Sequence, residues 1–291
     1  MDGIIVINKE KNCTSHDVVR RAKKVFNEKI GHTGTLDPNA TGVLPLLVGQ
    51  GTKISKYLIN HDKIYEATLK LGEKKDTADI EGKTIEKQEV QEKSLEKDNV
   101  EKVFKEIIGK QKQIPPIYSA IKVKGKKLYE YARTGQNVEI KAREIEIYDI
   151  KLININKENK EIIFKVKCSK GTYIRTLCEN IAEKLESIGY MKELKRVQVG
   201  EFSIENSIKI EELENNFNNQ EFMEKYFIKL ENYFSNFQKL KLDDKNLKKF
   251  LNGVQISFNL DDGIYNIYDM QNKFIGLAIL KNRRLKRDII L

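Results

Sequence analysis

One carboxylate in this sequence lies in a segment that would hold it in a fixed position. Asp37 stands within Gly31-His32-Thr33-Gly34-Thr35-Leu36-Asp37-Pro38-Asn39-Ala40-Thr41-Gly42, and an apolar stretch follows at residues 43–48. Pro38 disfavours the helical region for Asp37, and the glycines permit backbone angles that other residues rarely adopt. An Asp-Pro pair by itself is an ordinary surface turn. A carboxylate that such a loop positions can act as a nucleophile or stabilise a developing charge.

Two other residues could complement that carboxylate in a pocket. Arg175 lies in Gly171-Thr172-Tyr173-Ile174-Arg175, where a predicted strand turns into a predicted helix. A guanidinium beside Asp37 would offset the cost of desolvation and keep the pKa of that carboxyl low. For a single arginine, however, a surface ion pair is the more common outcome. Tyr65 offers a flat face for stacking and a hydroxyl whose pKa in water is about 10.

Metal and disulfide chemistry are not indicated. Asp76, Asp79 and Glu81 carry the oxygen ligands that hard cations take, but their spacing is not that of a calcium-binding loop, so no metal is expected. The three cysteines are odd in number and include no Cys-x-x-Cys pair. This excludes a recognisable zinc site or disulfide framework and fits a reducing cytoplasm.

The sequence is basic overall. Its 291 residues include 53 Lys and Arg against 43 Asp and Glu, which gives a net charge of +10. The excess favours a polyanionic partner, with nucleic acid first and an anionic membrane surface second, although abundant Lys and Glu also indicate compositional bias. No apolar run reaches the roughly 20 residues that span a bilayer. Residues 3–7 are expected to form a strand rather than part of a signal peptide.

Helical and strand patterns alternate irregularly along the first part of the chain. A helix that Thr14 or Ser15 caps is predicted from the apolar spacing of residues 18–26, and further helices are predicted at residues 95–108 and 172–188. Strands are predicted at residues 3–7, 43–48, 65–71, 145–155 and 162–168. This irregular order predicts an α+β fold with a mixed sheet rather than a regular βαβ array.

The C-terminal part has a different character. Residues 211–236 are rich in Asn, Glu and Phe without clean periodicity, and we expect a helical connector there. A short helix at residues 245–251 and strands at residues 254–258, 264–268, 274–280 and 287–291 predict a small β-rich unit. Two domains are therefore expected, residues 1–236 and residues 237–291.

Further blocks of sequence accompany the loop around Asp37. In chain order they are Lys63-Ile64-Tyr65-Glu66-Ala67, Leu71-Gly72-Glu73-Lys74-Lys75-Asp76-Thr77-Ala78-Asp79-Ile80-Glu81-Gly82, Gln113-Ile114-Pro115-Pro116-Ile117-Tyr118-Ser119-Ala120-Ile121-Lys122, Cys168-Ser169-Lys170-Gly171-Thr172-Tyr173-Ile174-Arg175-Thr176-Leu177 and Leu194-Lys195-Arg196. Together these blocks resemble the TruB family of tRNA pseudouridine synthases, over about two-thirds of the chain. The C-terminal unit, with Phe274-Ile275-Gly276-Leu277-Ala278 and a basic tail, looks like a PUA domain, an RNA-binding module attached to the same family.

The resemblance implies a fold and an activity. The fold is the pseudouridine synthase fold, a mixed and largely antiparallel sheet flanked by helices, with the small PUA-like domain at its C-terminus. The activity is the isomerisation of uridine to pseudouridine in the T-loop of tRNA, at position 55, on a flipped-out base. Because that isomerisation is redox-neutral, no cofactor is expected.

The resemblance also implies roles for individual residues. Asp37 would be the nucleophile, Tyr65 would lie against the target uracil, and Arg175 would bridge Asp37 and Asp79. Whether Asp37 attacks the ribose, attacks the base or abstracts a ribose proton stays open, with the ribose route slightly favoured.

Three more residues receive roles in the same way. Leu194 would pack against the uracil and exclude water. His32 would occupy the gap that a flipped base leaves in a stacked loop. Lys9 is expected only to support the loop around Asp37.

The expected partner is tRNA, through its T-arm, and no membrane or protein partner is expected. Residues 122–143 carry five Lys and two Arg with Tyr129 and Tyr131 among them, which suits phosphate contacts and stacking in folded RNA. A cytoplasmic monomer is expected. Two alternatives stay open: a related RNA-guided synthase that relies on partner proteins and a guide RNA, and a non-catalytic RNA-binding or RNA-folding protein that retains the fold.

Overall fold

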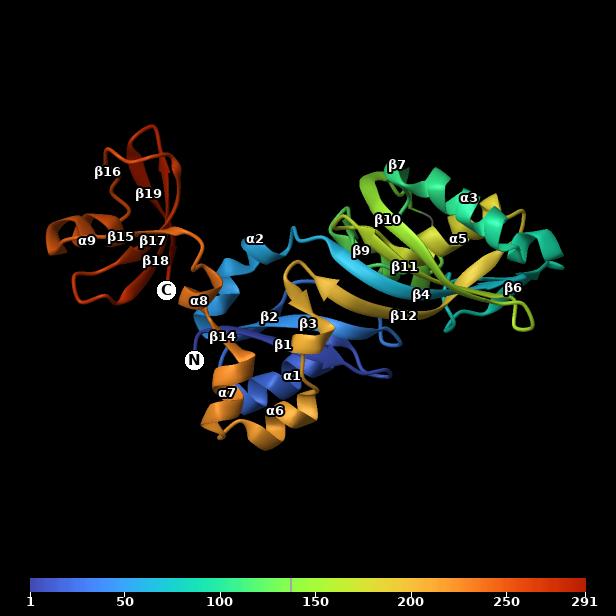
Figure 1. The fold of residues 1–291 in the computed structure, drawn as a ribbon, viewed down its shortest axis with the longest axis horizontal. Helices are drawn as coiled ribbons and strands as arrows, with labels where there is room; N and C mark the ends of the chain where they lie inside the picture. Colours follow the sequence, from blue (N-terminus) through green and yellow to red (C-terminus); the bar gives the residue numbers. More distant parts are fainter. Residues whose placement is uncertain (137) are drawn as a thin grey trace.

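The computed structural model describes residues 1–136 and 138–291. Two β-sheets dominate it, a ten-stranded sheet in the larger part and a five-stranded sheet near the C-terminus (Figure 1). Both ends of the chain lie near the junction between the two parts (Figure 1). No described helix is long and apolar enough to cross a membrane.

The large sheet is mixed and mostly antiparallel. Its main path runs β14-β1-β3-β12-β4-β11-β10-β7, and β2 and β13 pair with β3 and β12 beside that path. The bounds are β1 (Gly3–Lys9), β2 (Ile30–His32), β3 (Thr41–Val48), β4 (Lys63–Leu71), β7 (Gly109–Gln113), β10 (Arg143–Asn156), β11 (Glu161–Cys168), β12 (Gly189–Val199), β13 (Phe202–Ser203) and β14 (Phe227–Lys229). Among the described strand pairs of this sheet, β3·β12 alone is parallel. The expected α+β fold with a mixed, largely antiparallel sheet is confirmed.

Strand β12 lies between β3 and β4 and brings distant parts of the sequence together. Gly42 of β3 pairs with Arg196, and Tyr65 of β4 pairs with the same residue on the other side. At Gly42 the backbone φ is +105°, and a Cβ there would lie 2.1 Å from the Arg196 carbonyl oxygen. Glycine is therefore required for β3 and β12 to approach this closely.

Helices cover the sheet in two groups (Figure 1). Helix α1 (Ser15–Phe26) packs beside α6 (Ile210–Asn216) and α7 (Gln220–Tyr226) near β1, whereas α3 (Lys97–Ile107) and α5 (Ile174–Lys184) lie over the end formed by β10 and β11. The Thr14 hydroxyl accepts from Asp17 N–H and the Asp17 carboxylate accepts from Thr14 N–H, a reciprocal cap that fixes the start of α1. The predicted cap and helix are confirmed.

The C-terminal sheet has the order β15-β17-β18-β19-β16. Its strands are β15 (Gln238–Lys241), β16 (Ile256–Ser257), β17 (Gly263–Tyr268), β18 (Phe274–Lys281) and β19 (Arg284–Ile290), with α9 (Asp244–Leu251) beside them. Leu277 and Ile289 join an apolar cluster with Ile4, Val6 and Leu47 of the large sheet. The C-terminal sheet is therefore packed against the larger part through a shared core.

The remaining elements are short. They are β5 (Glu73–Lys75), β6 (Thr84–Lys87), β8 (Lys122–Val123), β9 (Lys126–Lys127), α2 (Ser55–Leu58), α4 (Leu128–Arg133), α8 (Leu230–Tyr233) and the 3₁₀ turns η1 (Gly49–Ile54), η2 (Glu92–Leu95) and η3 (Ile204–Asn206). Strands β8 and β9 form a hairpin that leads into α4. Position 137, inside the basic segment 122–143, lies outside the described residues.

Two expectations about the elements are wrong. The helix expected at residues 172–188 ends at Lys184, after which the chain turns and enters β12. Residues 211–236 are not helical throughout, because Phe227–Lys229 forms β14 at the edge of the large sheet, paired with β1. In both places tertiary pairing overrides a weak local pattern.

Candidate active site

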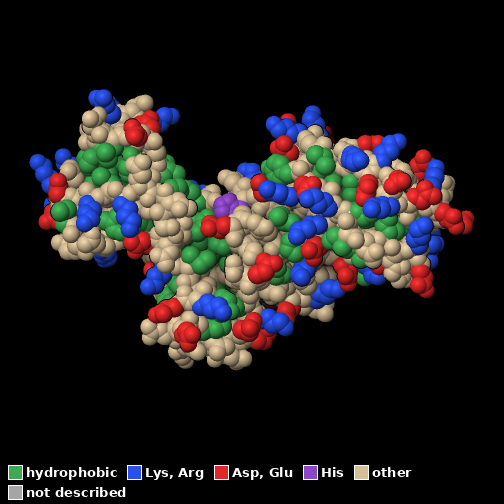
Figure 2. Space-filling view, viewed as in Figure 1, with side chains coloured by type: hydrophobic (Ala, Val, Ile, Leu, Met, Phe, Trp, Pro, Cys, Tyr) green, Lys and Arg blue, Asp and Glu red, His purple; other side chains and the backbone are tan. Residues whose placement is uncertain are grey.

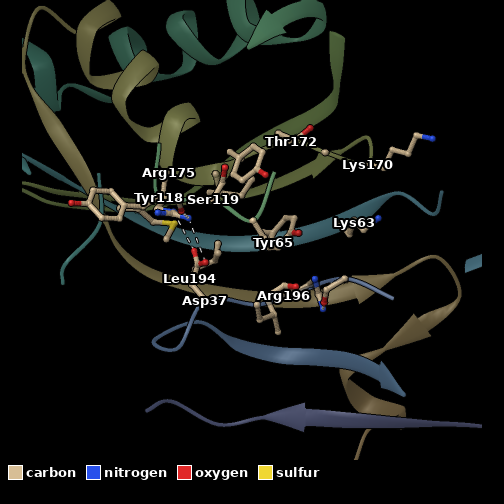
Figure 3. Close-up of a pocket in the computed structure, with 18 of the residues that line it drawn as sticks. Asp37, Lys63, Tyr65, Tyr118, Ser119, Lys170, Thr172, Arg175, Leu194 and Arg196 are labelled. Atoms are coloured by element: carbon tan, nitrogen blue, oxygen red, sulfur yellow. Dashed lines mark hydrogen bonds and ion pairs between the residues drawn. The ribbon is translucent and has the colours of Figure 1, made fainter. Parts of the chain in front are cut away.

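A cavity of about 600 Å³ opens where the loop before β3 faces β4, β12 and the start of α5 (Figure 3). Asp37, Tyr65, Arg175 and Leu194 all contribute to its lining. They come from four separate segments of the chain. The ladders of β12 with β3 and β4 hold three of these segments side by side, and α5, which carries Arg175, packs against β12. Asp79 lies behind this lining and reaches it through Arg175.

Buried contacts fix the backbone around Asp37. The Ser15 hydroxyl donates to the Leu36 carbonyl at 3.1 Å and accepts from Leu36 N–H at 2.9 Å. The Lys9 ammonium, 1% exposed, donates to the carbonyls of Pro38, Glu10 and Cys13 at 2.7–3.0 Å. The expected support of the loop by Lys9 is thus confirmed.

Arg175 bridges the two carboxylates, as the resemblance implied. Its Nε lies 3.2 Å from Asp37 Oδ2, its Nη2 lies 3.4 Å from Asp37 Oδ1, and its Nη1 lies 3.5 Å from Asp79 Oδ2. Two carbonyls also accept from it, Tyr118 at 3.0 Å and Thr77 at 3.3 Å. The planar guanidinium therefore sets the orientation of Asp37 through two parallel contacts.

Asp79 is held independently of Arg175. Its Oδ1 accepts from the Thr77 hydroxyl at 2.6 Å and from Glu81 N–H at 3.1 Å. Asp79 also pairs with Met191 at the start of β12. Asp79 thus holds the Arg175 guanidinium at Nη1, while Asp37 contacts Nε and Nη2 of the same group.

The pKa of Asp37 departs from the sequence-based expectation. Burial of the carboxyl raises its pKa above the usual value, and this effect outweighs the opposing effect of Arg175. Asp79 adds to the increase because a second carboxylate nearby disfavours ionisation. The expectation that Arg175 keeps this pKa low is therefore wrong. Still, 36% of the Asp37 side chain is exposed to the cavity, so the carboxylate is accessible to a substrate.

Tyr65 lies on the floor of the cavity, near Asp37 and Arg196 (Figure 3). Burial raises the pKa of its hydroxyl, although the Arg196 guanidinium acts in the opposite direction. The phenol is therefore protonated at neutral pH and can donate a hydrogen bond. Leu194 lines the same space from β12.

His32 occupies a different place from the other predicted residues. It ends β2, one position before the lining of the cavity begins at Thr33. Its Nδ1 accepts from Gly34 N–H at 3.3 Å, and burial lowers the pKa of the imidazole. His32 is consequently neutral and half-buried at the rim rather than part of the wall.

Sequence reasoning gave no role to Arg196, although its position is central. It is 2% exposed, its Nε donates to the Val43 carbonyl at 2.8 Å, and its Nη2 donates to the Gly34 carbonyl at 3.0 Å. Arg196 therefore ties both ends of the Asp37 loop to β12. Lys63 was also passed over; burial lowers its pKa to about 8 beside the cavity.

Basic side chains on the surface do not form one uniform patch. On the face in Figure 2, Lys and Arg gather around β9, β10 and β11 with acidic side chains among them. The outline is hollowed between this end and the C-terminal sheet. Among residues 1–136 and 138–291, no three His, Cys, Asp or Glu side chains group closely enough to hold a metal ion.

The fold of this chain is similar to that of solved RNA-bound and protein-bound complexes. A chain in the structure of an H/ACA RNP bound to a substrate RNA containing 2′-deoxyuridine is similar, with a TM-score of 0.70, 22% identity, and coverage of 99% of this chain and 84% of that one. A chain of a Cbf5-Nop10-Gar1 complex matches with a TM-score of 0.71, 23% identity and the same coverage. At this identity the likeness shows a shared fold.

The sequence comparisons then define the family. The N-terminal domain model of TruB family pseudouridylate synthases matches residues 21–174, and the C-terminal domain model of tRNA pseudouridylate synthase B matches residues 175–252. A tRNA pseudouridine synthase B of Clostridium kluyveri is 43% identical over 98% of both chains, and one of Clostridium tetani is 45% identical over 96% of this chain and 95% of the relative. This chain belongs to the TruB family. It is a pseudouridine synthase, an isomerase that acts on tRNA.

Proposed function

We propose that this enzyme isomerises the T-loop uridine of tRNA, at position 55, with Asp37 as the nucleophile on a base flipped out into the cavity. The observation that carries the proposal is the Asp37 carboxylate, which Arg175 holds through two contacts at 3.2 and 3.4 Å at the edge of a cavity of about 600 Å³. That volume is within the usual range for a site that encloses a small ligand.

The reaction needs few groups. The bond between N1 of uracil and C1′ of ribose breaks, the base rotates, and C5 joins C1′ while the proton of C5 is lost and N1 gains one. Electrons balance without an oxidant or reductant, so no cofactor is required. Attack at C1′, attack on the base and abstraction of a ribose proton all need the same ionised carboxylate. The proposal therefore concerns Asp37 rather than one of these routes.

The other residues provide the environment of the base. Tyr65 would stack against the uracil and donate or relay a proton through its hydroxyl. Leu194 would cover the base and exclude water, which keeps the freed uracil in place. His32, neutral and at the rim, would occupy the position in the RNA stack that the flipped nucleotide leaves.

Binding of the rest of the tRNA would fall to the basic surfaces. Residues 122–133 carry Lys122, Lys124, Lys126, Lys127 and Arg133 next to the cavity residues Tyr118 and Tyr129. The C-terminal sheet, which we propose as a PUA-like RNA-binding domain over residues 237–291, carries further exposed basic residues from Lys281 to Arg287. We propose residues 1–236 as the catalytic domain and a cytoplasmic monomer that uses no protein partner.

The purified chain alone should convert the T-loop uridine of an unmodified tRNA transcript. This outcome is expected because every proposed catalytic group belongs to one chain, and it is measured by mapping pseudouridine at nucleotide resolution. A transcript with cytidine at position 55 is the control and should remain unmodified. If product appears only after a guide RNA or a second protein is added, the RNA-guided alternative is correct and the stand-alone assignment is wrong.

As the pH is lowered, the single-turnover rate should begin to fall at a higher pH than the pKa of an ordinary aspartate would predict. Burial raises the pKa of Asp37, so a larger fraction of this carboxyl is protonated at each acidic pH, and the protonated form is no nucleophile. The rate is measured at saturating enzyme from neutral to acidic pH, and thermal unfolding at each pH controls for stability. A profile that stays flat down to the pKa of an exposed aspartate would contradict a raised pKa of Asp37 in the reacting complex.

A further inference from the structure

Two hydroxyl groups in the wall of the cavity have no hydrogen-bond partner among the described protein groups. Thr33 is 3% exposed and Ser119 is 5% exposed, and both line the cavity together with Asp37 and Tyr65. The nearby Thr172 hydroxyl differs, because it donates to the Ser169 carbonyl at 3.0 Å. The lack of a partner is therefore a property of these two positions rather than of every hydroxyl in the lining.

Buried hydroxyls without partners are rare, because burial removes their hydrogen bonds to water and no protein group replaces those bonds. Only two other buried side-chain atoms in the described part of the chain are in the same state, one in His61 and one in Asn266. Neither of those residues lines the cavity that holds Asp37. Two of the four unpartnered atoms thus belong to residues that line a single cavity. Both oxygens are themselves enclosed, so a ligand in the cavity supplies their partners after rotation of each side chain about χ1.

The two hydroxyls belong to separate segments. Thr33 lies between β2 and β3, in the loop that carries Asp37. Ser119 lies between β7 and β8, next to Tyr118, whose carbonyl accepts from Arg175 at 3.0 Å. The Ser119 carbonyl in turn accepts from Tyr129 N–H at 3.1 Å, at the first turn of α4 in the basic segment. Ser119 is therefore connected through the backbone both to the guanidinium and to the basic segment.

We propose that Ser119 and Thr33 bind the flipped nucleoside, each through a hydrogen bond from its hydroxyl to an acceptor oxygen of that nucleoside. This inference rests on the proposed function, since it takes a flipped uridine as the occupant of the cavity. A hydroxyl can donate one hydrogen bond and accept others, and uridine offers O2 and O4 of the base and the ribose 2′-oxygen. The two residues seat the nucleoside so that Asp37 can reach it.

The proposal predicts an unusual pairing of effects for Ser119→Ala and Thr33→Val. Each variant removes a polar group that is unpaired in the free protein, so thermal stability should stay unchanged or increase. Each also removes a contact to the seated nucleoside, so the single-turnover rate at saturating enzyme should fall about tenfold. The dissociation constant for tRNA should change little, because phosphate contacts elsewhere supply most of the affinity.

Ser94→Ala is the matched control. Ser94 is fully buried, and its hydroxyl donates to the Leu185 carbonyl at 2.8 Å, away from the cavity. This variant loses a satisfied hydrogen bond, so stability should fall while the rate of folded enzyme stays at the wild-type value. If Ser119→Ala and Thr33→Val instead behave like Ser94→Ala, with lower stability and normal rate, the two hydroxyls are structural and the proposal is wrong.

Modified substrates identify the acceptor. Three tRNAs carry 2-thiouridine, 4-thiouridine or 2′-deoxyuridine at the target position, and each is tested with wild type, with Ser119→Ala and with Thr33→Val. Wild type should convert the tRNA that lacks the contacted oxygen more slowly than unmodified tRNA. The variant should convert both tRNAs at the same rate, because the contact is already lost, and a double-mutant cycle measures this non-additivity. Fully additive effects for all three substrates, with both variants, would overturn the proposal. Loss of activity of wild type on unmodified tRNA would instead contradict the proposed function itself.

Discussion

Replacing Arg175 with methionine is expected to slow single-turnover pseudouridine formation by about two to three orders of magnitude. Removing one partner of a buried, hydrogen-bonded ion pair costs about 3–5 kcal/mol, because the charge left behind is uncompensated. Here that charge is shared by Asp37 and Asp79, which would face each other without a counter-ion. The pocket would then favour a protonated Asp37, so the acid limb of the pH profile should move to higher pH and the rate should recover in part at alkaline pH.

Arg175→Lys tests geometry separately from charge. An ammonium keeps the positive charge but cannot make two parallel contacts to Asp37 while also reaching Asp79. We expect a loss of about a hundredfold, with a smaller shift of the pH profile than methionine gives. Binding of tRNA, measured by filter retention, should stay close to that of wild type for both variants.

Arg21→Met is the control for loss of an arginine ion pair elsewhere. Arg21 of α1 pairs with Glu211 at 2.6 Å and with Glu214 at 2.5 Å, and it does not line the cavity. The Arg21→Met variant should have a slightly lower free energy of unfolding and the same single-turnover rate per folded molecule as wild type. Near-normal rates for both Arg175 variants would show that something other than this guanidinium holds the nucleophile.

The parts of the fold that could be predicted from the sequence are those with a strong local pattern. Helix α1 has a reciprocal cap and a clear apolar face, and β3, β4 and β11 have buried or alternating apolar residues. Strand β12 was not predicted, because Gly-Tyr-Met-Lys-Glu-Leu-Lys-Arg-Val-Gln-Val mixes charged and apolar residues without alternation. Its position in the middle of the sheet depends on pairing with β3 and β4, and such long-range pairing leaves little trace in a local pattern.

The candidate site could be predicted in part for the same reason. Asp37 stands out because its loop combines three glycines, a proline and turn residues. A guanidinium partner for it was a candidate on chemical grounds, and the bridge through Arg175 was implied by the resemblance to the TruB family. The importance of Arg196 could not be seen, since its role is to bind carbonyls of Gly34 and Val43 that are distant in sequence. The direction of the Asp37 pKa shift was also missed, because burial depends on the whole surrounding fold rather than on one neighbour.

Asp37→Asn is expected to abolish isomerisation while leaving tRNA binding largely intact. The amide keeps the size and shape of the side chain, so the loop contacts of Lys9 and Ser15 persist, but the charged nucleophile is gone. Loss of a nucleophile from a site of this kind lowers the rate by at least about a thousandfold. The half-buried Asp149, which pairs with Lys151 at 3.2 Å, supplies the matched control Asp149→Asn, with no expected change in rate.

The most direct test is therefore the single-turnover yield of pseudouridine at position 55 with Asp37→Asn in excess over tRNA. The protein is checked by mass spectrometry for deamidation back to aspartate, and binding is confirmed in the same samples. We predict bound tRNA with no product on the timescale of many wild-type turnovers. Turnover within about tenfold of wild type, from protein free of deamidation, would contradict the assignment of Asp37 as the nucleophile.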